Sequence, residues 1–193
     1  MRRLGVAFTG GLNPPDLVEC VQLTEELGYE SAWMAEGRGG DQFSVLTACA
    51  LVTSSIRLGT GISSVFVRSA PTIGMASACV DYFSGGRFIL GLGTSHKVQV
   101  GPEHGLPFYQ PILRMRETVD IVRGLLRDGR VSYHGDVFDI DEFALQFQPL
   151  RPEIPIYVAA VFPKMLEICG EIAQGALLTW CTVEYAQKAA AHV

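Results

Sequence analysis

The residues most able to do chemistry follow short apolar runs in which the sequence predicts β-strands. His96 comes soon after residues 87–93, and Glu36 follows residues 31–35. A histidine can carry a proton near neutral pH, so His96 is a candidate proton donor, although a histidine in a loop is also often a surface residue. Glu36 is either a polar anchor for the neighbouring loops or an acid of the site, and the local pattern favours the anchor.

The turn of residues 159–164 is a second candidate, because it joins a predicted strand directly to a predicted helix. Ala159 and Ala160 end the strand, and Pro163 begins the helix. The first N–H groups of a helix have no intrahelical partner and lie at the positive end of its dipole, so together with Lys164 they would suit a phosphate. An ordinary strand-to-helix turn has the same composition, and the local sequence alone favours that simpler interpretation.

Other common chemistries lack their motifs. Residues 59–64 and 91–96 contain Gly-x-Gly without the third glycine of a dinucleotide-binding turn, and neither stretch opens a helix at once. The sequence has no Walker A, Gly-x-Ser-x-Gly or His-Glu-x-x-His motif. No metal site is predicted, because no two cysteines form a Cys-x-x-Cys and most fit apolar helical patterns as buried thiols: Cys20, Cys49, Cys79, Cys169 and Cys181.

The elements that must position these residues alternate between strands and helices. Apolar runs typical of buried parallel strands occupy residues 4–8, 31–35, 57–62, 87–93, 155–160 and 176–180. Helical patterns begin near residues 13, 41, 70, 111, 163 and 182, where Asn13 and Asp41 are predicted N-caps. Six such units predict an α/β fold, either a doubly wound open sheet or a (β/α)8 barrel, and both place ligands at the carboxyl ends of the strands.

An insertion at about 130–150 interrupts the alternation. Residues 131–133 and 137–140 are predicted to form a β-hairpin around a His-Gly-Asp turn, with residues 144–147 as a possible third strand. No linker or low-complexity segment divides the chain, so residues 1–193 are expected to form a single domain.

Composition excludes several classes of protein. Hydrophobic residues make up 48% and charged residues 18% of the 193 residues, so the chain is expected to fold around a sizeable core. The net charge is −5 without a basic stripe, which excludes a nucleic-acid groove. No apolar run approaches the ~20 residues of a membrane span, so no membrane partner is predicted and a cytoplasmic location is expected.

Four stretches resemble the luciferase-like monooxygenase superfamily, and most closely the branch that uses the deazaflavin coenzyme F420, such as methylenetetrahydromethanopterin reductase. The most specific stretch is FSGGRFILGLGT, residues 83–94. The others are ELGYESAWMAE at residues 26–36, RLGTGI at 57–62, and PIYVAA at 155–160 with the following Pro163-Lys164.

The resemblance implies a (β/α)8 barrel, here incomplete with about six βα units. Residues 1–193 would then be truncated before strands seven and eight, and strands one and six would keep open edges. It also implies a bulge after strand three, at Gly61-Ile62-Ser63, which often contains a non-prolyl cis peptide and backs the cofactor ring. His96 and Glu36 would be the catalytic residues. The implied cofactor-binding residues are Phe8, Gly61, Ile62, Ser63, Gly93, Thr94, Ser95, Ala159, Ala160, Val161, Phe162, Pro163 and Lys164.

The implied activity is that of an oxidoreductase, in which a hydride passes between the reduced deazaflavin and an organic small-molecule acceptor. Two alternatives remain: an FMN-dependent monooxygenase on the same scaffold, or a non-catalytic flavin-binding remnant. The resemblance further implies a homodimer through the helices at about 41–54 and 70–84, which are nearly free of charge.

Overall fold

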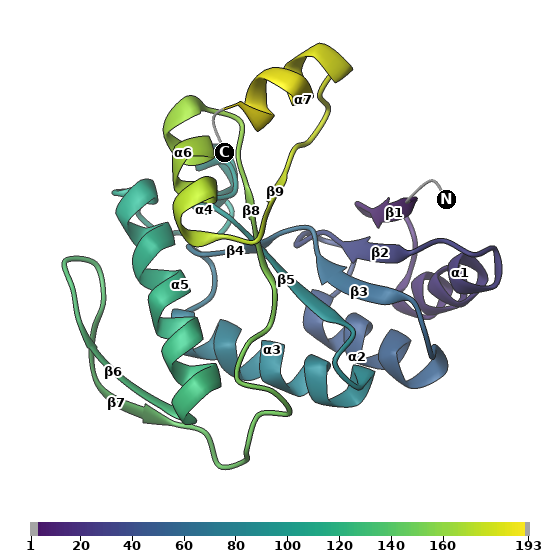
Figure 1. Ribbon diagram of the computed structural model, residues 1–193, viewed down its shortest axis with the longest axis horizontal. Helices are drawn as coiled ribbons and strands as arrows, with labels where there is room; N and C mark the ends of the chain where they lie inside the picture. Colours follow the sequence, from purple (N-terminus) through teal and green to yellow (C-terminus); the bar gives the residue numbers. More distant parts are fainter. Residues whose placement is uncertain (1–3, 192–193) are drawn as a thin grey trace.

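The computed structural model describes residues 4–191, in which a parallel sheet forms an open half-barrel (Figure 1). Its main strands follow the order β1 (Gly5–Phe8), β2 (Ser31–Met34), β3 (Arg57–Thr60), β5 (Phe88–Gly93), β8 (Ile156–Ala159) and β9 (Gly175–Leu177). A short strand, β4 (Ser63–Ser64), extends the pairing along β5. Within the described residues β1 and β9 do not pair with each other, so the predicted six-unit incomplete barrel is confirmed.

The helices lie beside one another along the sheet. They are α1 (Pro14–Glu26), α2 (Gln42–Val52), α3 (Ala70–Ser84), α4 (Lys97–Val100), α5 (Pro111–Asp128), α6 (Pro163–Ile172) and α7 (Val183–Ala190). Neighbouring contacts run from α1 to α2, α3, α5 and α6 in that order. Each crossover therefore returns the chain to the same edge of the sheet, and the carboxyl ends of all main strands meet there.

Local cap signals explain where the helices begin and end. Asn13 accepts a hydrogen bond from the N–H of Asp16, and Asp41 accepts one from the N–H of Ser44, so both predicted caps are confirmed. Gly85 ends α3 with φ +63°, a conformation that favours glycine. The following Arg87 donates to the carbonyl oxygens of Ala50, Thr53 and Ile56, and so ties α2 to the start of β3.

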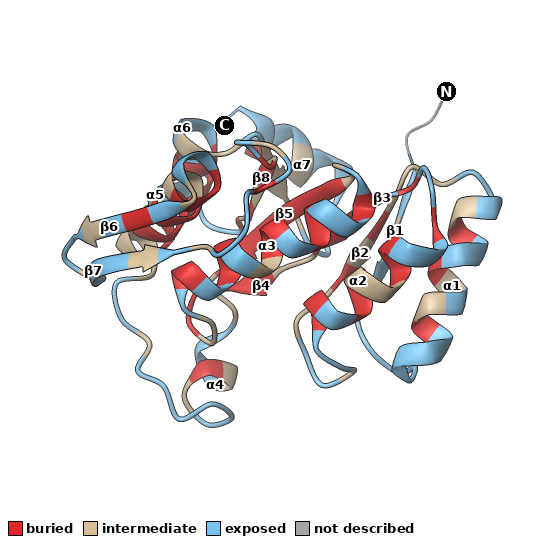
Figure 2. Ribbon diagram, turned by 90° about the horizontal axis from the view of Figure 1, so that it is seen from below, coloured by how far each residue is buried: buried red, intermediate tan, exposed pale blue. Residues whose placement is uncertain are grey.

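The core lies between the sheet and its helices. All six residues of β5 are buried, as Figure 2 shows in red. The opposite face of the sheet forms the inner wall of the half-barrel, where the rings of Trp33 and Tyr157 lie 5.8 Å apart between centroids. A Cβ on Gly59 would lie 2.4 Å from the Trp33 ring, so only glycine allows this ring to lie across the neighbouring strand.

The predicted hairpin is present as β6 (Arg130–His134) and β7 (Asp139–Ala144). The possible third strand at residues 144–147 is wrong, because β7 itself runs to Ala144 and pairs it with Arg130. The strand expected at residues 176–180 ends at Leu177, and Trp180 adopts φ +52°, which no strand residue has. The short α4 inside the loop after β5 was not predicted.

Candidate active site

The bulge at residues 61–63 is fixed on both sides at the carboxyl end of the sheet. The N–H of Gly61 donates to the carbonyl oxygen of Met34 at 2.7 Å, and the N–H of Val65 donates to that of Gly93 at 3.0 Å. The Gly61–Ile62 peptide is cis, as the resemblance implied. The bulge therefore lies between β2 and β5 and holds three of the predicted cofactor-binding residues.

Two glycines allow the bulge to approach its neighbours closely. A Cβ on Gly93 would lie 2.5 Å from Cγ1 of Ile62, and a Cβ on Gly61 would lie 3.2 Å from Cβ of Trp33. Ile62 thus covers the end of β5, and the structure brings the predicted residues Ile62 and Gly93 into contact. Thr94 and Ser95 continue from β5 and are partly exposed at the same edge.

Glu36 holds the bulge rather than facing solvent. Its Oε2 accepts the N–H of Ser64 at 2.6 Å and the hydroxyl of Ser63 at 3.4 Å, while its own N–H donates to the carbonyl of Ile62 at 3.2 Å. Its side chain is 15% exposed. These contacts are those of the polar anchor that the sequence favoured, and a catalytic role for Glu36 stays a prediction.

Arg68 is a site residue that the sequence analysis missed. Its Nε lies 2.5 Å from Oε1 of Glu36, its second guanidinium nitrogen pairs with Asp41, and its guanidinium carbon lies 5.1 Å from the centroid of the Phe43 ring. Burial alone would raise the pKa of Asp41. The hydrogen bonds from Ser44 and Arg68 outweigh this effect, so the pKa of Asp41 is lowered. The sequence signal was weak, because Glu36 and Arg68 are 32 residues apart.

His96 is exposed at the start of α4, where its backbone carbonyl accepts hydrogen bonds from the N–H groups of Gln99 and Val100. The preceding Ser95 adopts φ +57°, and its hydroxyl lies 3.4 Å from Oε1 of Gln99. The imidazole is therefore free to meet a ligand at this edge, but its catalytic role stays a prediction.

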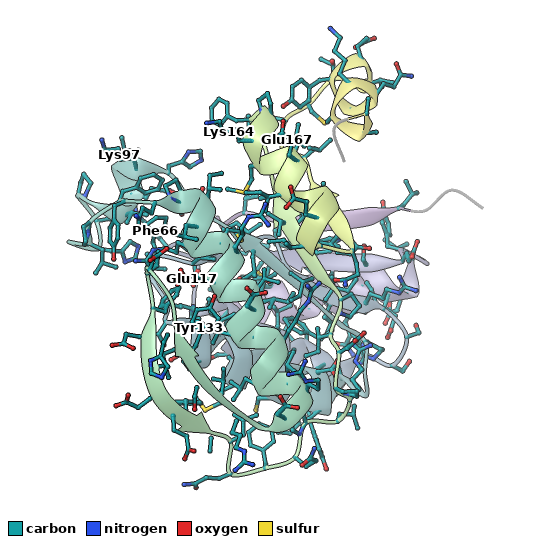
Figure 3. The ribbon with its side chains drawn as sticks, turned by 60° about the vertical axis from the view of Figure 1, so that its left-hand side comes forward. Phe66, Lys97, Glu117, Tyr133, Lys164 and Glu167 are labelled. Carbon is teal, nitrogen blue, oxygen red and sulfur yellow. The ribbon has the colours of Figure 1, made fainter. Side chains whose placement is uncertain are left out.

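The turn after β8, which is the predicted phosphate site, is partly exposed. Ala160 is buried and its N–H donates to Leu177, whereas Val161 and Phe162 are 57% and 74% exposed. Phe162 is the N-cap of α6 and makes no side-chain capping bond. Pro163 has no N–H and the N–H of Met165 donates to the carbonyl of Phe162, so in the first turn the N–H of Lys164 lacks an intrahelical partner. Figure 3 shows Lys164 at the start of α6, at the same end of the molecule as Lys97 on α4.

Two hollows in the described part of the chain differ in volume and in their position on the sheet. A recess of about 10 Å³ lies at the carboxyl end of β1, lined by residues that include Phe8, Met34 and Val45. A cavity of about 260 Å³ opens instead on the inner wall near the amino ends of the strands, lined by Leu4, Gly5, Glu30, Ser31, Trp33, Arg57, Ile89 and Tyr157. Of the predicted cofactor-binding residues, Phe8 lines the smaller recess and none lines the larger cavity.

Comparison with known proteins identifies the family. A model of the luciferase-like monooxygenase family matches residues 3–193, and the chain belongs to this family. It is 33% identical over 177 residues to the 5,10-methylenetetrahydromethanopterin reductase of Archaeoglobus fulgidus, covering 91% of this chain and 52% of that protein. The reductase of Methanolobus tindarius is 32% identical over 175 residues, which cover 90% of this chain and 53% of that protein.

A solved structure agrees with these relatives. The coenzyme F420-dependent tetrahydromethanopterin reductase of Methanopyrus kandleri superimposes with a TM-score of 0.84 at 28% identity, covering 91% of this chain and 55% of that chain. The present chain therefore spans about half the length of the relatives it matches. Among the described residues no helix is long and apolar enough to cross a membrane.

Proposed function

We propose that this chain forms the cofactor-binding part of a coenzyme F420-dependent oxidoreductase. The observation that carries the proposal is its 33% identity, over 91% of its length, to a methylenetetrahydromethanopterin reductase, together with its superposition on an F420-dependent reductase. Because the chain spans about half of those proteins, the activity and the substrate of the whole enzyme remain part of the proposal.

The residues at the carboxyl edge fit such a cofactor. Gly61 and Gly93 leave the space in which Trp33 and Ile62 pack against the bulge, and we expect a flat ring system to lie against the partly exposed Gly61 and Ile62. The start of α6 offers the backbone N–H of Lys164 to a phosphate, and the side chain of Lys164 adds a positive charge in the same turn.

The cofactor and the protein would contribute different parts of the reaction. When bound, the reduced deazaflavin supplies the hydride, and the protein supplies orientation and electrostatics. The bulge would back the ring, while the turn at residues 160–164 would hold the phosphate. An imidazole nitrogen of His96 would hold or donate the proton that a carbonyl or imine acceptor needs.

A charge reversal tests the phosphate site. We expect Lys164→Glu to weaken F420 binding by roughly tenfold or more, because a carboxylate would face the phosphate across the first turn of α6. Lys188→Glu on α7 is the matched control, since it makes the same change of charge at an exposed position. Fluorescence titration measures both affinities, and equal affinities of the two variants would place the phosphate elsewhere.

The surface through which the chain would contact a second copy is also part of the proposal. Large apolar side chains are exposed on α2 and α3, including Leu51 at 66% and Tyr82 at 58%. Burying such a patch against the same patch of a second copy would remove apolar area from water, so we propose a two-fold homodimer through these helices.

A further inference from the structure

Arg68 joins three segments at the carboxyl edge of the sheet. It follows β4, and its guanidinium contacts Glu36 after β2 and Asp41 at the start of α2. Its side chain is 22% exposed and lies over the ring of Phe43, so the pair with Glu36 is largely shielded from water, whereas the side chain of Asp41 is 44% exposed. A planar guanidinium is suited to this task, because it presents several donors in a fixed geometry.

Glu36 transmits that position to the bulge. One of its oxygens pairs with Arg68, while the other accepts the N–H of Ser64 at 2.6 Å. If the cation were absent, Oε1 of this largely buried carboxylate would lose its partner, and the carboxylate would gain by turning toward water. Such a turn would release Ser64 and, with it, the stretch that begins at Ile62.

We propose that Arg68 is a positioning residue for cofactor binding, which acts through Glu36 to hold residues 62–64 in the shape that backs the ring. The inference rests on the proposed function for the role of the bulge. When the bulge is already ordered, none of the binding free energy of the cofactor is used to order it. Loss of Arg68 therefore lowers the affinity for the cofactor, although no group that touches the cofactor is removed.

The second partner of Arg68 provides a way to separate two roles. Asp41 caps α2, so Arg68 could also act by steadying that helix. Asparagine caps a helix as well as aspartate does, which makes Asp41→Asn a variant that loses the ion pair and keeps the cap. If Arg68 acts through Glu36, amide exchange at Ser64 and affinity for F420 in Asp41→Asn stay close to those of the wild type. If Arg68 acts through α2, both resemble those of Arg68→Met.

Amide hydrogen exchange of the free protein tests the positioning role without any cofactor. Arg68→Met should speed exchange at the N–H of Ser64 by roughly tenfold or more, since a charge-assisted hydrogen bond is lost, and Arg68→Lys should restore part of the protection. Arg127→Met is the control, because Arg127 pairs with Asp128 at the exposed far end of α5. Unchanged exchange at Ser64 in Arg68→Met would overturn the inference. If Arg68→Met fails to fold, faster exchange at the N–H of Ser64 in Glu36→Gln tests the same ion pair.

Titration with F420 tests the consequence. Arg68→Met should raise the dissociation constant by roughly tenfold, and Arg68→Lys should fall between it and the wild type. In the double variant with Glu36→Gln the effect should be no larger than in Arg68→Met alone, because both act through one contact. Faster exchange at Ser64 with unchanged affinity would overturn the inference, whereas a wild type that binds no F420 would contradict the proposed function instead.

Discussion

At the scale of single residues, carboxylates hold turns of this chain through backbone N–H groups. Glu25 on α1 accepts the N–H groups of Ser54, Ser55 and Ile56 at 2.6–3.0 Å, and so holds the turn between α2 and β3. Burial raises the pKa of Glu25, but the hydrogen bonds from these residues outweigh it and lower the pKa from 4.5 to about 2. Such a carboxylate links the stability of the fold to pH.

The direction of this pH dependence of stability follows from the lowered pKa of Glu25. Because the folded-state pKa lies below the unfolded value, the contribution of Glu25 is complete above pH 4.5 and is lost as the pH falls toward 2. We expect Glu25→Gln to be less stable than the wild type at neutral pH, and the difference to shrink across that range. Urea unfolding at several pH values measures it, with the exposed Glu26→Gln as control. A difference that does not change with pH would contradict this role.

At the scale of elements, one buried side chain holds the tip of the hairpin β6–β7. Glu117 on α5 is 3% exposed and accepts the N–H groups of Asp136, Val137 and Phe138 at 2.9–3.2 Å. Figure 3 shows Glu117 on α5 beside the hairpin that carries Tyr133. The hairpin tip therefore depends on a contact between distant parts of the sequence.

Removal of this carboxylate should loosen the hairpin. Glu117→Ala leaves three N–H groups of the tip without a partner, which should cost about 2–4 kcal/mol of the free energy of unfolding. Limited proteolysis should then cut first near residues 135–138. Glu142→Ala, at an exposed position of β7, is the control, and equal thermal stability of the two variants would show that the tip is held by other contacts.

The sequence predicted those parts of the molecule that local signals determine. Asn13, Asp41 and the glycines after α3 act within a few residues, so the helices they bound were placed correctly. The network of Glu36 and Arg68 depends on partners about 30 residues apart, and no local pattern indicates such a pair. The third hairpin strand failed for a related reason, because pairing with Arg130 decides where β7 ends.

At the scale of the whole molecule, the chain is a half-barrel whose outer helices α2 and α3 expose several large apolar side chains. The edges of β1 and β9 are not paired with each other within the described residues, and the inner wall carries the Trp33–Tyr157 pair. The Methanopyrus kandleri reductase, of which the chain covers 55%, shares this fold at a TM-score of 0.84. The carboxyl edge holds the candidate site, while the exposed residues of α2 and α3 lie on the outer helices.

The outer face leads to a prediction about assembly. We expect the chain to be a dimer by light scattering at micromolar concentration, and Leu51→Asp or Tyr82→Asp to shift it toward the monomer, because a buried charge would lack a partner in the interface. Leu27→Asp at the C-cap of α1 is the matched control, since Leu27 is 67% exposed outside the proposed interface. A monomeric wild type would contradict the proposed homodimer.

Cofactor choice tests the proposed oxidoreductase most directly. The wild-type chain should be titrated in parallel into coenzyme F420 and into FMN, and the two dissociation constants compared. We expect F420 to bind at least about tenfold more tightly than FMN, a difference of about 1.4 kcal/mol in binding free energy, because the F420-dependent reductase of Methanopyrus kandleri is 28% identical and superimposes with a TM-score of 0.84. Tighter binding of FMN would indicate the monooxygenase instead, and no binding of either cofactor would contradict the cofactor site at the carboxyl edge.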